Sequence, residues 1–156
     1  MALAYLITWA VYGTWLPGDR RKSVSEENRR GAPFERPNPA RVAYHRELLQ
    51  HRPHALSQAE RATVENTIRE VCEIRGWSLR AVNARSNHVH TVVSCSVTPE
   101  KVLVDLKSWA TRRLRAMDPD RFEGRVWTKH GSARHLFDAP SVKRAIEYVQ
   151  HHQERA

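Results

Sequence analysis

The chain of 156 residues is poor in cysteine, in acidic side chains and in long apolar runs. Its two cysteines, Cys72 and Cys95, are too few for the disulfide framework of a small secreted domain. No apolar stretch is long enough to span a bilayer. The apolar start, residues 1–16, lacks the basic segment and the cleavage site of a secretory leader. These absences predict a cytoplasmic protein with no membrane partner.

The shortage of acidic residues leaves a strongly basic chain. Lys and Arg number 26 against 17 Asp and Glu, which gives a formal net charge of +9. A small domain this basic usually binds a polyanion, most often nucleic acid. The alternative is a merely soluble surface, which the clustering of the arginines disfavours. With 40% apolar and 28% charged residues, the composition is that of one globular domain spanning residues 1–156.

The first half of the chain predicts a strand, an insertion and a helix. Apolar residues occupy both faces of residues 3–11, as in a central strand covered by helices. An insertion follows at about 18–54, mostly polar, with room for a short helix near its end. A helix then begins at Ser57, which forms a capping box with Glu60, and it ends at Gly76.

The second half predicts two strands, a helix, another strand and a last helix. Strands at 77–84 and 88–96 are followed by a helix with Thr98 as its cap and Pro99 at its first position. Residues 125–137 fit either one strand or a hairpin that turns at Gly131. A final helix covers about 141–153.

This order of elements predicts an α+β fold of the ferredoxin-like type, β-α-β-β-α-β. In that arrangement an antiparallel sheet carries helices on one face, and the first and third strands lie side by side at its centre. The C-terminal helix, which carries Tyr148, is an addition to this core.

Two histidines, His88 and His90, are two residues apart on the third predicted strand. Side chains alternate along a strand, so both imidazoles point to one face while Val89 points to the other. Parallel imidazoles on a rigid support form a pair of metal ligands that needs one or two further groups. The alternative is a pair of solvated or structural histidines.

Tyr148 and His152 are four residues apart on the last predicted helix and would share one of its faces. If that face meets the histidine pair, a three-histidine metal site forms with a phenol beside it. Such a site suits attack by Tyr on phosphorus, with a divalent cation polarising the phosphoryl group. Lys129 is a candidate to assist the phenol or to contact the phosphate. The alternative is that Tyr148 packs under the helix and that the histidines form a solvated tail.

Asn87-His88-Val89-His90 on a strand, with Tyr148 on a late helix, resembles the single-tyrosine HUH transposases. These are the IS200/IS605-like group and its REP-associated tyrosine transposase relatives. The opening YLITWAVYGTWLPGD also looks like the start of some members. The chain departs from many of them in having Arg85-Ser86 where they have Met-Pro, and in the long insertion.

The resemblance implies a metal-dependent transposase that nicks and joins single-stranded DNA, with a hairpin as the recognition element. It implies that His88, His90 and His152 bind Mg²⁺ or Mn²⁺ and that Tyr148 is the nucleophile, leaving a 5′-phosphotyrosine. It leaves open whether the protein is a monomer or a homodimer.

Basic side chains provide candidate contacts to the DNA backbone. The candidates are Lys107, Arg112, Arg113, Arg115, Lys129 and Arg134. Trp15, Trp109 and Trp127 could each stack on a base, although a place in the core is the more common role of tryptophan.

Two other functions remain open from the sequence. One is a domesticated DNA-binding protein that keeps the fold and the charge but has lost turnover. The other is a metal hydrolase acting on a small substrate, which the net charge of +9 disfavours.

Overall fold

The computed structural model describes residues 1–13 and 55–152. The insertion expected at about 18–54 lies outside these residues, as does Trp15. Within the described ranges, none of the helices combines the length and the apolar composition needed to cross a membrane.

Four strands form one antiparallel sheet in the order β2-β3-β1-β4. The strands are β1 (Ala4–Val11), β2 (Ser78–Ala84), β3 (His88–Ser94) and β4 (Trp127–Leu136). The helices are α2 (Gln58–Arg75), α3 (Pro99–Met117) and α4 (Ala139–Glu147), and a π-helical turn (Tyr148–His152) follows α4 directly. The first and third predicted strands, β1 and β3, are neighbours at the centre, so the ferredoxin-like prediction is confirmed.

Local sequence signals set the ends of α2 and α3. Ser57 accepts a hydrogen bond from the Glu60 backbone, and the Glu60 carboxylate accepts one from the Ser57 backbone in return. Gly76 ends α2 with a φ of 72°, a left-handed conformation that costs glycine little. The Thr98 hydroxyl caps α3 by accepting from the Lys101 backbone N–H.

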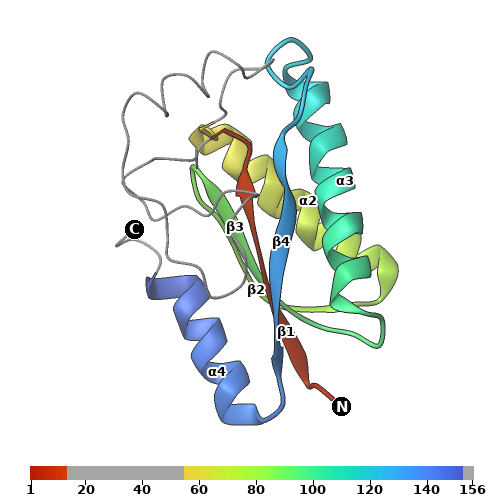
Figure 1. The fold of residues 1–156 in the computed structure, drawn as a ribbon, viewed down its shortest axis with the longest axis vertical. Helices are drawn as coiled ribbons and strands as arrows, with labels where there is room; N and C mark the ends of the chain where they lie inside the picture. Colours follow the sequence, from red (N-terminus) through yellow and green to blue (C-terminus); the bar gives the residue numbers. More distant parts are fainter. Residues whose placement is uncertain (14–54, 153–156) are drawn as a thin grey trace, which may run out of the picture.

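The sheet lies between two unequal layers, with α2 and α3 on one face and α4 on the other (Figure 1). Alternation along β1 supplies both cores. Ile7, Trp9 and Val11 pack with α2 and α3, whereas Ala4 and Leu6 pack with α4. A fully buried side chain of this size contributes about 1.5–3 kcal/mol to folding, so most of the stability comes from the larger α2–α3 side.

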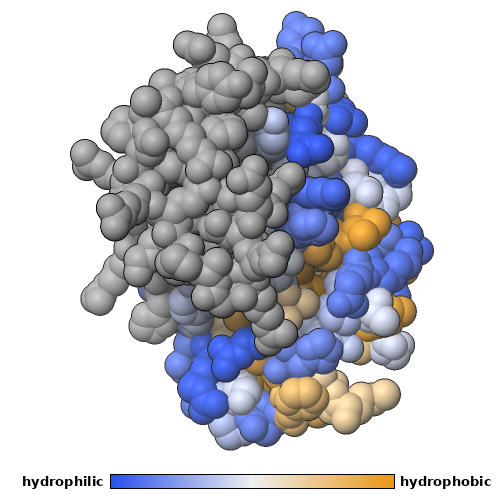
Figure 2. All heavy atoms as spheres, viewed as in Figure 1, coloured by the Kyte–Doolittle hydropathy of each residue, from blue (hydrophilic) through white to orange (hydrophobic). Residues whose placement is uncertain are grey.

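The smaller layer depends on one apolar stripe of the C-terminal helix. Val142, Ala145, Ile146 and Val149 follow the i, i+3, i+4, i+7 spacing of an amphipathic helix and pack against the sheet. The outer surface over α4 is correspondingly hydrophilic, at the lower left of Figure 2.

One expectation from the sequence is corrected, and one alternative that it left open is resolved. The last helix does not run unbroken to residue 153, because α4 ends at Glu147 and the chain continues as the π turn. Residues 127–136 form one strand instead of a hairpin, with Gly131 paired to Trp9. A Cβ added at Gly131 would lie 2.7 Å from the Thr8 carbonyl oxygen, so this glycine permits close approach of β4 to β1.

Candidate active site

A row of four polar residues crosses the sheet on the side that α4 covers. The backbone pairing places Asn83 of β2 opposite His90 of β3, His90 opposite Thr8 of β1, and Thr8 opposite Ser132 of β4. Each strand therefore supplies one member. On the next rows, Val92, Leu6 and Ala4 are apolar and lie in the core under α4. The polar row is thus the border between that core and the site.

His88 and His90 point to the same side of β3, as their spacing predicts, with ring centroids 4.6 Å apart and planes perpendicular. Val89 between them is fully buried on the opposite face. The Nδ1 atom of His88 donates to the Asn87 amide oxygen, which can only accept. The Nδ1 atom of His90 is hydrogen-bonded to the Thr8 hydroxyl at 2.9 Å. Both rings are therefore held through Nδ1, which leaves the Nε2 atoms for another ligand.

Burial keeps both imidazoles neutral at pH 7. Burial, together with the smaller effect of the neighbouring His88, lowers the pKa of His90 to about 4. Burial followed by the charge of Arg85 also lowers the pKa of His88. Neutral imidazole is the form that binds metal, so no proton has to be removed first.

Tyr148 lies beside this pair. Its ring makes an edge-to-face contact with His90, with centroids 5.5 Å apart. The side chain is 44% exposed, so the phenol is not packed under the helix. Of the two alternatives left by the sequence, burial of Tyr148 is therefore excluded.

The turn that carries Tyr148 is anchored to the sheet. The Asn83 amide donates to the Val149 carbonyl oxygen at 2.9 Å, and the Val149 side chain is fully buried. Carbonyl groups at a helix end lack intrahelical partners, and Asn83 supplies one. The π conformation begins at Tyr148 itself, and single π turns in helices occur often at functional sites. Asn83 thus links β2, the strand next to the one with the histidines, to the π turn that carries Tyr148.

A cleft of about 570 Å³ opens between the sheet and α4 at this point. Its lining comes from β1, β3, β4, α4 and the π turn, and consists of Leu6, Thr8, His90, Ser132, Arg134, Leu136, Ser141, Arg144, Ala145 and Tyr148. The volume is in the range of sites that bind small ligands or parts of larger ones.

The described side chains near Tyr148 fit two positions of a metal site. His88 and His90 supply two neutral nitrogens, the usual ligands of many divalent ions. Among the described residues, no group of three His, Cys, Asp or Glu side chains could hold one ion. The backbone of His152 ends the π turn, but its side chain lies outside the part that the structure describes.

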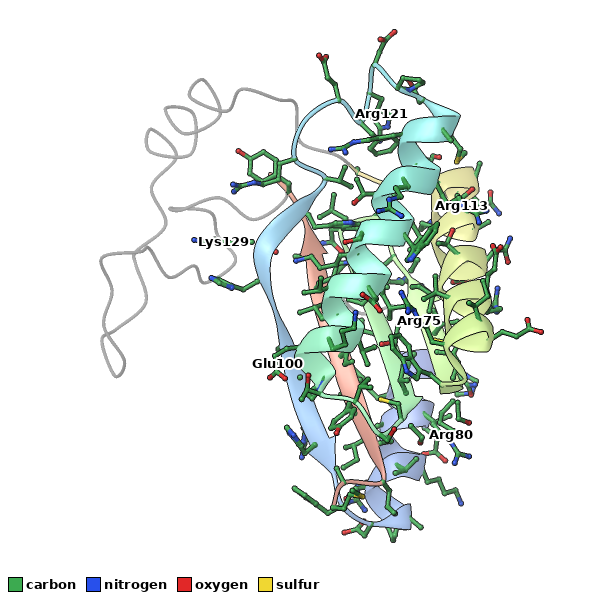
Figure 3. All side chains as sticks on the ribbon, turned by 90° about the vertical axis from the view of Figure 1, so that its right-hand side faces the viewer. Arg75, Arg80, Glu100, Arg113, Arg121 and Lys129 are labelled. Carbon is green, nitrogen blue, oxygen red and sulfur yellow. The ribbon has the colours of Figure 1, made fainter. Side chains whose placement is uncertain are left out.

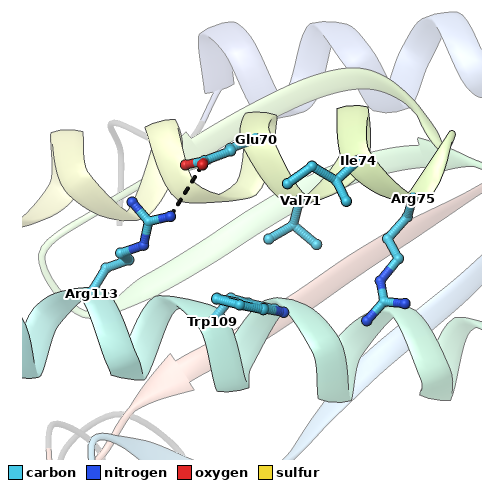
Figure 4. A pocket seen from close by; sticks show the side chains of 6 residues that line it. All are labelled: Glu70, Val71, Ile74, Arg75, Trp109 and Arg113. Atoms are coloured by element: carbon cyan, nitrogen blue, oxygen red, sulfur yellow. Dashed lines mark hydrogen bonds and ion pairs between the residues drawn. The ribbon is translucent and has the colours of Figure 1, made fainter.

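Most of the predicted DNA contacts on α3 lie on the opposite side of the sheet from the histidines. Arg113 forms an ion pair with Glu70 at 3.1 Å across a groove between α2 and α3 (Figure 4). Arg112 lies over the Trp109 ring, 4.6 Å from its centroid. Arg115 donates to the carbonyl oxygens of Phe122 and Gly124. The fold therefore does not bring these three arginines to the cleft.

Lys107, the other α3 candidate, is half-buried and donates to the Thr128 carbonyl oxygen at 2.8 Å, and burial lowers its pKa. Trp127 is buried and donates to the Thr111 hydroxyl, so it cannot stack on a base.

The two β4 candidates differ in position. Arg134 lines the cleft with Tyr148. Lys129 is exposed near the other end of the strand and points outward from the sheet edge in Figure 3.

Four residues of the site were missed by the sequence analysis, namely Thr8, Asn83, Ser132 and Arg144. Two of them carried a signal. Thr8 is the hydroxyl-bearing residue on an otherwise apolar face of the first strand, and Arg144 precedes Tyr148 by four residues. Asn83 and Ser132 had none, because only strand register places them.

Comparison with solved structures gives similar folds at low identity. A putative transposase from Deinococcus radiodurans R1 is 14% identical, with a TM-score of 0.49, over 92% of this chain and 86% of that one. A REP-associated tyrosine transposase bound to a REP hairpin is 9% identical, with a TM-score of 0.50, over 96% of this chain and 66% of that one. Among curated proteins, none matches the sequence.

The sequence itself matches a family profile. The match is to the family described as transposase IS200 like, and it covers residues 41–152, well over half of the chain. This range includes the histidine strand and the segment with Tyr148. The chain therefore belongs to the IS200-like transposase family.

Proposed function

We propose that the protein nicks and rejoins single-stranded DNA, with Tyr148 as the nucleophile. The contact between the exposed Tyr148 ring and the His90 ring, inside one cleft, is the observation that carries this proposal. Membership of the transposase family and the net charge of +9 support DNA as the substrate.

In the proposed reaction the Tyr148 oxygen attacks phosphorus, and its proton passes to a base or to solvent. The bond from phosphorus to the 3′-oxygen breaks, and this oxygen leaves as a 3′-hydroxyl once protonated. The product is a 5′-phosphotyrosine, in which one phosphodiester bond has replaced another. Attack by a second 3′-hydroxyl reverses the step and joins the strands, so no nucleotide cofactor is needed.

His88, His90 and His152 are the proposed ligands of a Mg²⁺ or Mn²⁺ ion. Such an ion, when bound, polarises the phosphoryl group and withdraws charge from it. The hydrogen bonds at the two Nδ1 atoms keep the first two rings oriented with Nε2 available. Lys129 is proposed to contact DNA near the sheet edge.

The proposed DNA substrate carries a hairpin next to the unpaired strand. The similar fold of a REP-associated tyrosine transposase, solved with a REP hairpin, supports this choice. Unpaired nucleotides leave the scissile phosphate accessible to a side chain in a cleft.

The test is adduct formation with hairpin-bearing single-stranded DNA and Mn²⁺, followed by the mobility shift of the denatured protein. We expect a covalent adduct with the parent chain and none with Tyr148→Phe. Tyr5→Phe is the matched control, because Tyr5 contacts His135 and packs on the α2–α3 side.

Equal adduct from Tyr148→Phe and the parent chain would show that the nucleophile is another residue. DNA binding by the parent chain without any adduct would indicate a non-catalytic DNA-binding protein instead.

A further inference from the structure

The charged side chains that line the cleft are all basic. Its two charged side chains are Arg134 and Arg144, and none of its ten residues is acidic. Its floor contains the apolar side chains of Leu6, Leu136 and Ala145. A cleft with a cationic wall and an apolar floor suits a ligand that is anionic at one end and apolar at the other.

The two arginines reach this cleft from different elements. Arg134 is on β4, directly opposite Leu6 of β1 and two residues beyond Ser132 of the polar row. Arg144 is on α4, four residues before Tyr148, and its guanidinium donates to the Ser141 hydroxyl at 3.2 Å. They therefore face one space from the sheet and from the helix.

Neither arginine is neutralised by a carboxylate among the described residues. No described Asp or Glu lies within ion-pair distance of either one. The charge of Arg144 contributes to lowering the pKa of Asp138, after the hydrogen bonds from Ser141, but Asp138 does not line the cleft. By contrast, Arg113 on the far face is paired with Glu70. The cleft arginines remain available to an anion.

We propose that this cleft holds one unpaired nucleotide of the DNA strand beside the scissile bond, with Arg134 and Arg144 contacting the same phosphate. The inference rests on the proposed function, because Tyr148 in the lining of the cleft defines where the scissile bond lies. The apolar floor contacts the sugar or the base of this nucleotide. A nucleotide that is paired in a duplex could not make this contact. Arg144 and Arg134 are thus positioning residues for the strand.

The proposal is tested by binding alone, in the Tyr148→Phe protein with a chelator present, so that it does not depend on cleavage. The probe is oligothymidylate, a single strand without pairing. Arg134→Gln and Arg144→Gln are each expected to weaken binding about tenfold. Replacing both should lower the slope of log affinity against log salt by about 0.7, the value for one single-strand phosphate contact, and neither single replacement should lower it by more.

Lys143→Gln is the matched control. Lys143 is the exposed neighbour of Arg144 on the same helix, and it lines a separate hollow with Arg80 and Glu147. Its replacement should leave the salt slope unchanged. Arg144→Lys should keep the slope of the parent, because the charge is retained. An unchanged melting temperature for each variant shows that the fold is intact.

Three outcomes would overturn the proposal. One is a Lys143→Gln effect as large as that of Arg144→Gln, which would mean a diffuse charge effect. The second is full additivity in the double variant, because two arginines on one phosphate must be coupled. The third is an equal loss with an oligothymidylate–oligodeoxyadenylate duplex, which would exclude selectivity for an unpaired nucleotide. A failed adduct assay with normal behaviour here would reject the nucleophile and leave the cleft assignment standing.

Discussion

The two faces of the sheet are built from alternate residues of the same strands and differ in almost every property. The face toward α2 and α3 presents Ile7, Trp9, Val89 and Val93, all fully buried in one apolar cluster. The face toward α4 is apolar for only part of its area and then becomes the polar row that ends at Ser132. One face supplies most of the apolar packing and the other carries the candidate site. A substitution on one face should therefore change stability or activity without changing the other.

The largest expected effect is on adduct formation, and it comes from substitutions on the face toward α4. His88→Ala or His90→Ala should reduce adduct formation by more than about 100-fold, because each removes a proposed metal ligand. Affinity for single-stranded DNA should change little, since phosphate contacts come from other residues. Adduct yield and filter binding on the same preparations measure the two quantities. His135→Ala on β4, where His135 contacts Tyr5, is the control.

A parallel loss of DNA binding in the His88 and His90 variants would assign the pair a structural role instead.

A substitution on the face toward α2 and α3 should lower stability and leave adduct formation unchanged. Leu106→Ala in α3 removes a fully buried side chain and should cost about 2–5 kcal/mol in the free energy of unfolding. The adduct yield per folded molecule should stay near that of the parent. Urea denaturation gives the first quantity and the adduct assay below the transition gives the second. Loss of adduct formation in a Leu106→Ala protein that is still folded would mean that the two faces are coupled.

A smaller effect is expected from Thr8→Val, which removes the hydroxyl bonded to His90 and keeps the shape of the side chain. Loss of such an orienting bond typically weakens metal binding about 10–100-fold. Calorimetric titration of Mn²⁺ into the protein without DNA measures this affinity directly. Ser132→Ala, in the same row with no such bond to the histidine, should leave Mn²⁺ affinity unchanged. Equal affinities for Thr8→Val and the parent would remove Thr8 from the site.

The smallest effect is a pH dependence that belongs to the buried His90. Its pKa is about 4 in the folded protein and ordinarily about 6.5 in an unfolded chain. Between these values the unfolded state binds more protons, so stability is full above pH 6.5 and falls as the pH drops toward 4. The slope for one proton is at most about 1.4 kcal/mol per pH unit. Denaturation curves measured at several pH values with a chelator give the free energy of unfolding as a function of pH. This free energy should depend less steeply on pH for His90→Gln than for the parent. An equal dependence would contradict the assignment to His90.

Helix ends and the strands could be predicted from the sequence because their signals are local. The capping box at Ser57, the left-handed Gly76 and the cap at Thr98 all lie within a few residues of what they terminate. The histidine pair needed only the two-residue repeat of a strand. Along α3 the apolar side chains of Leu106, Ala110 and Leu114 are fully buried, whereas Met117 in the last turn of the helix is 46% exposed.

The rest of the site depends on which residues of distant strands lie opposite one another. Thr8 and His90 are 82 residues apart, and a register shift of one residue would turn either to the other face. A helical wheel likewise indicates that Arg112 is outside the buried stripe of α3 but not which layer the helix joins. The π turn that begins at Tyr148 contains Val149, whose carbonyl oxygen accepts from Asn83 of β2 in another long-range pairing.

The polar row draws each of its four members from a different strand, so no single loop owns any part of it. Connections between strands can then lengthen, shorten or be exchanged without moving a member, provided that every strand keeps its pairing. A site arranged in this way tolerates variation in the connections around it and resists variation in the strands that hold it. For protein engineering, this means that the connecting loops can be exchanged while the four strands are left untouched.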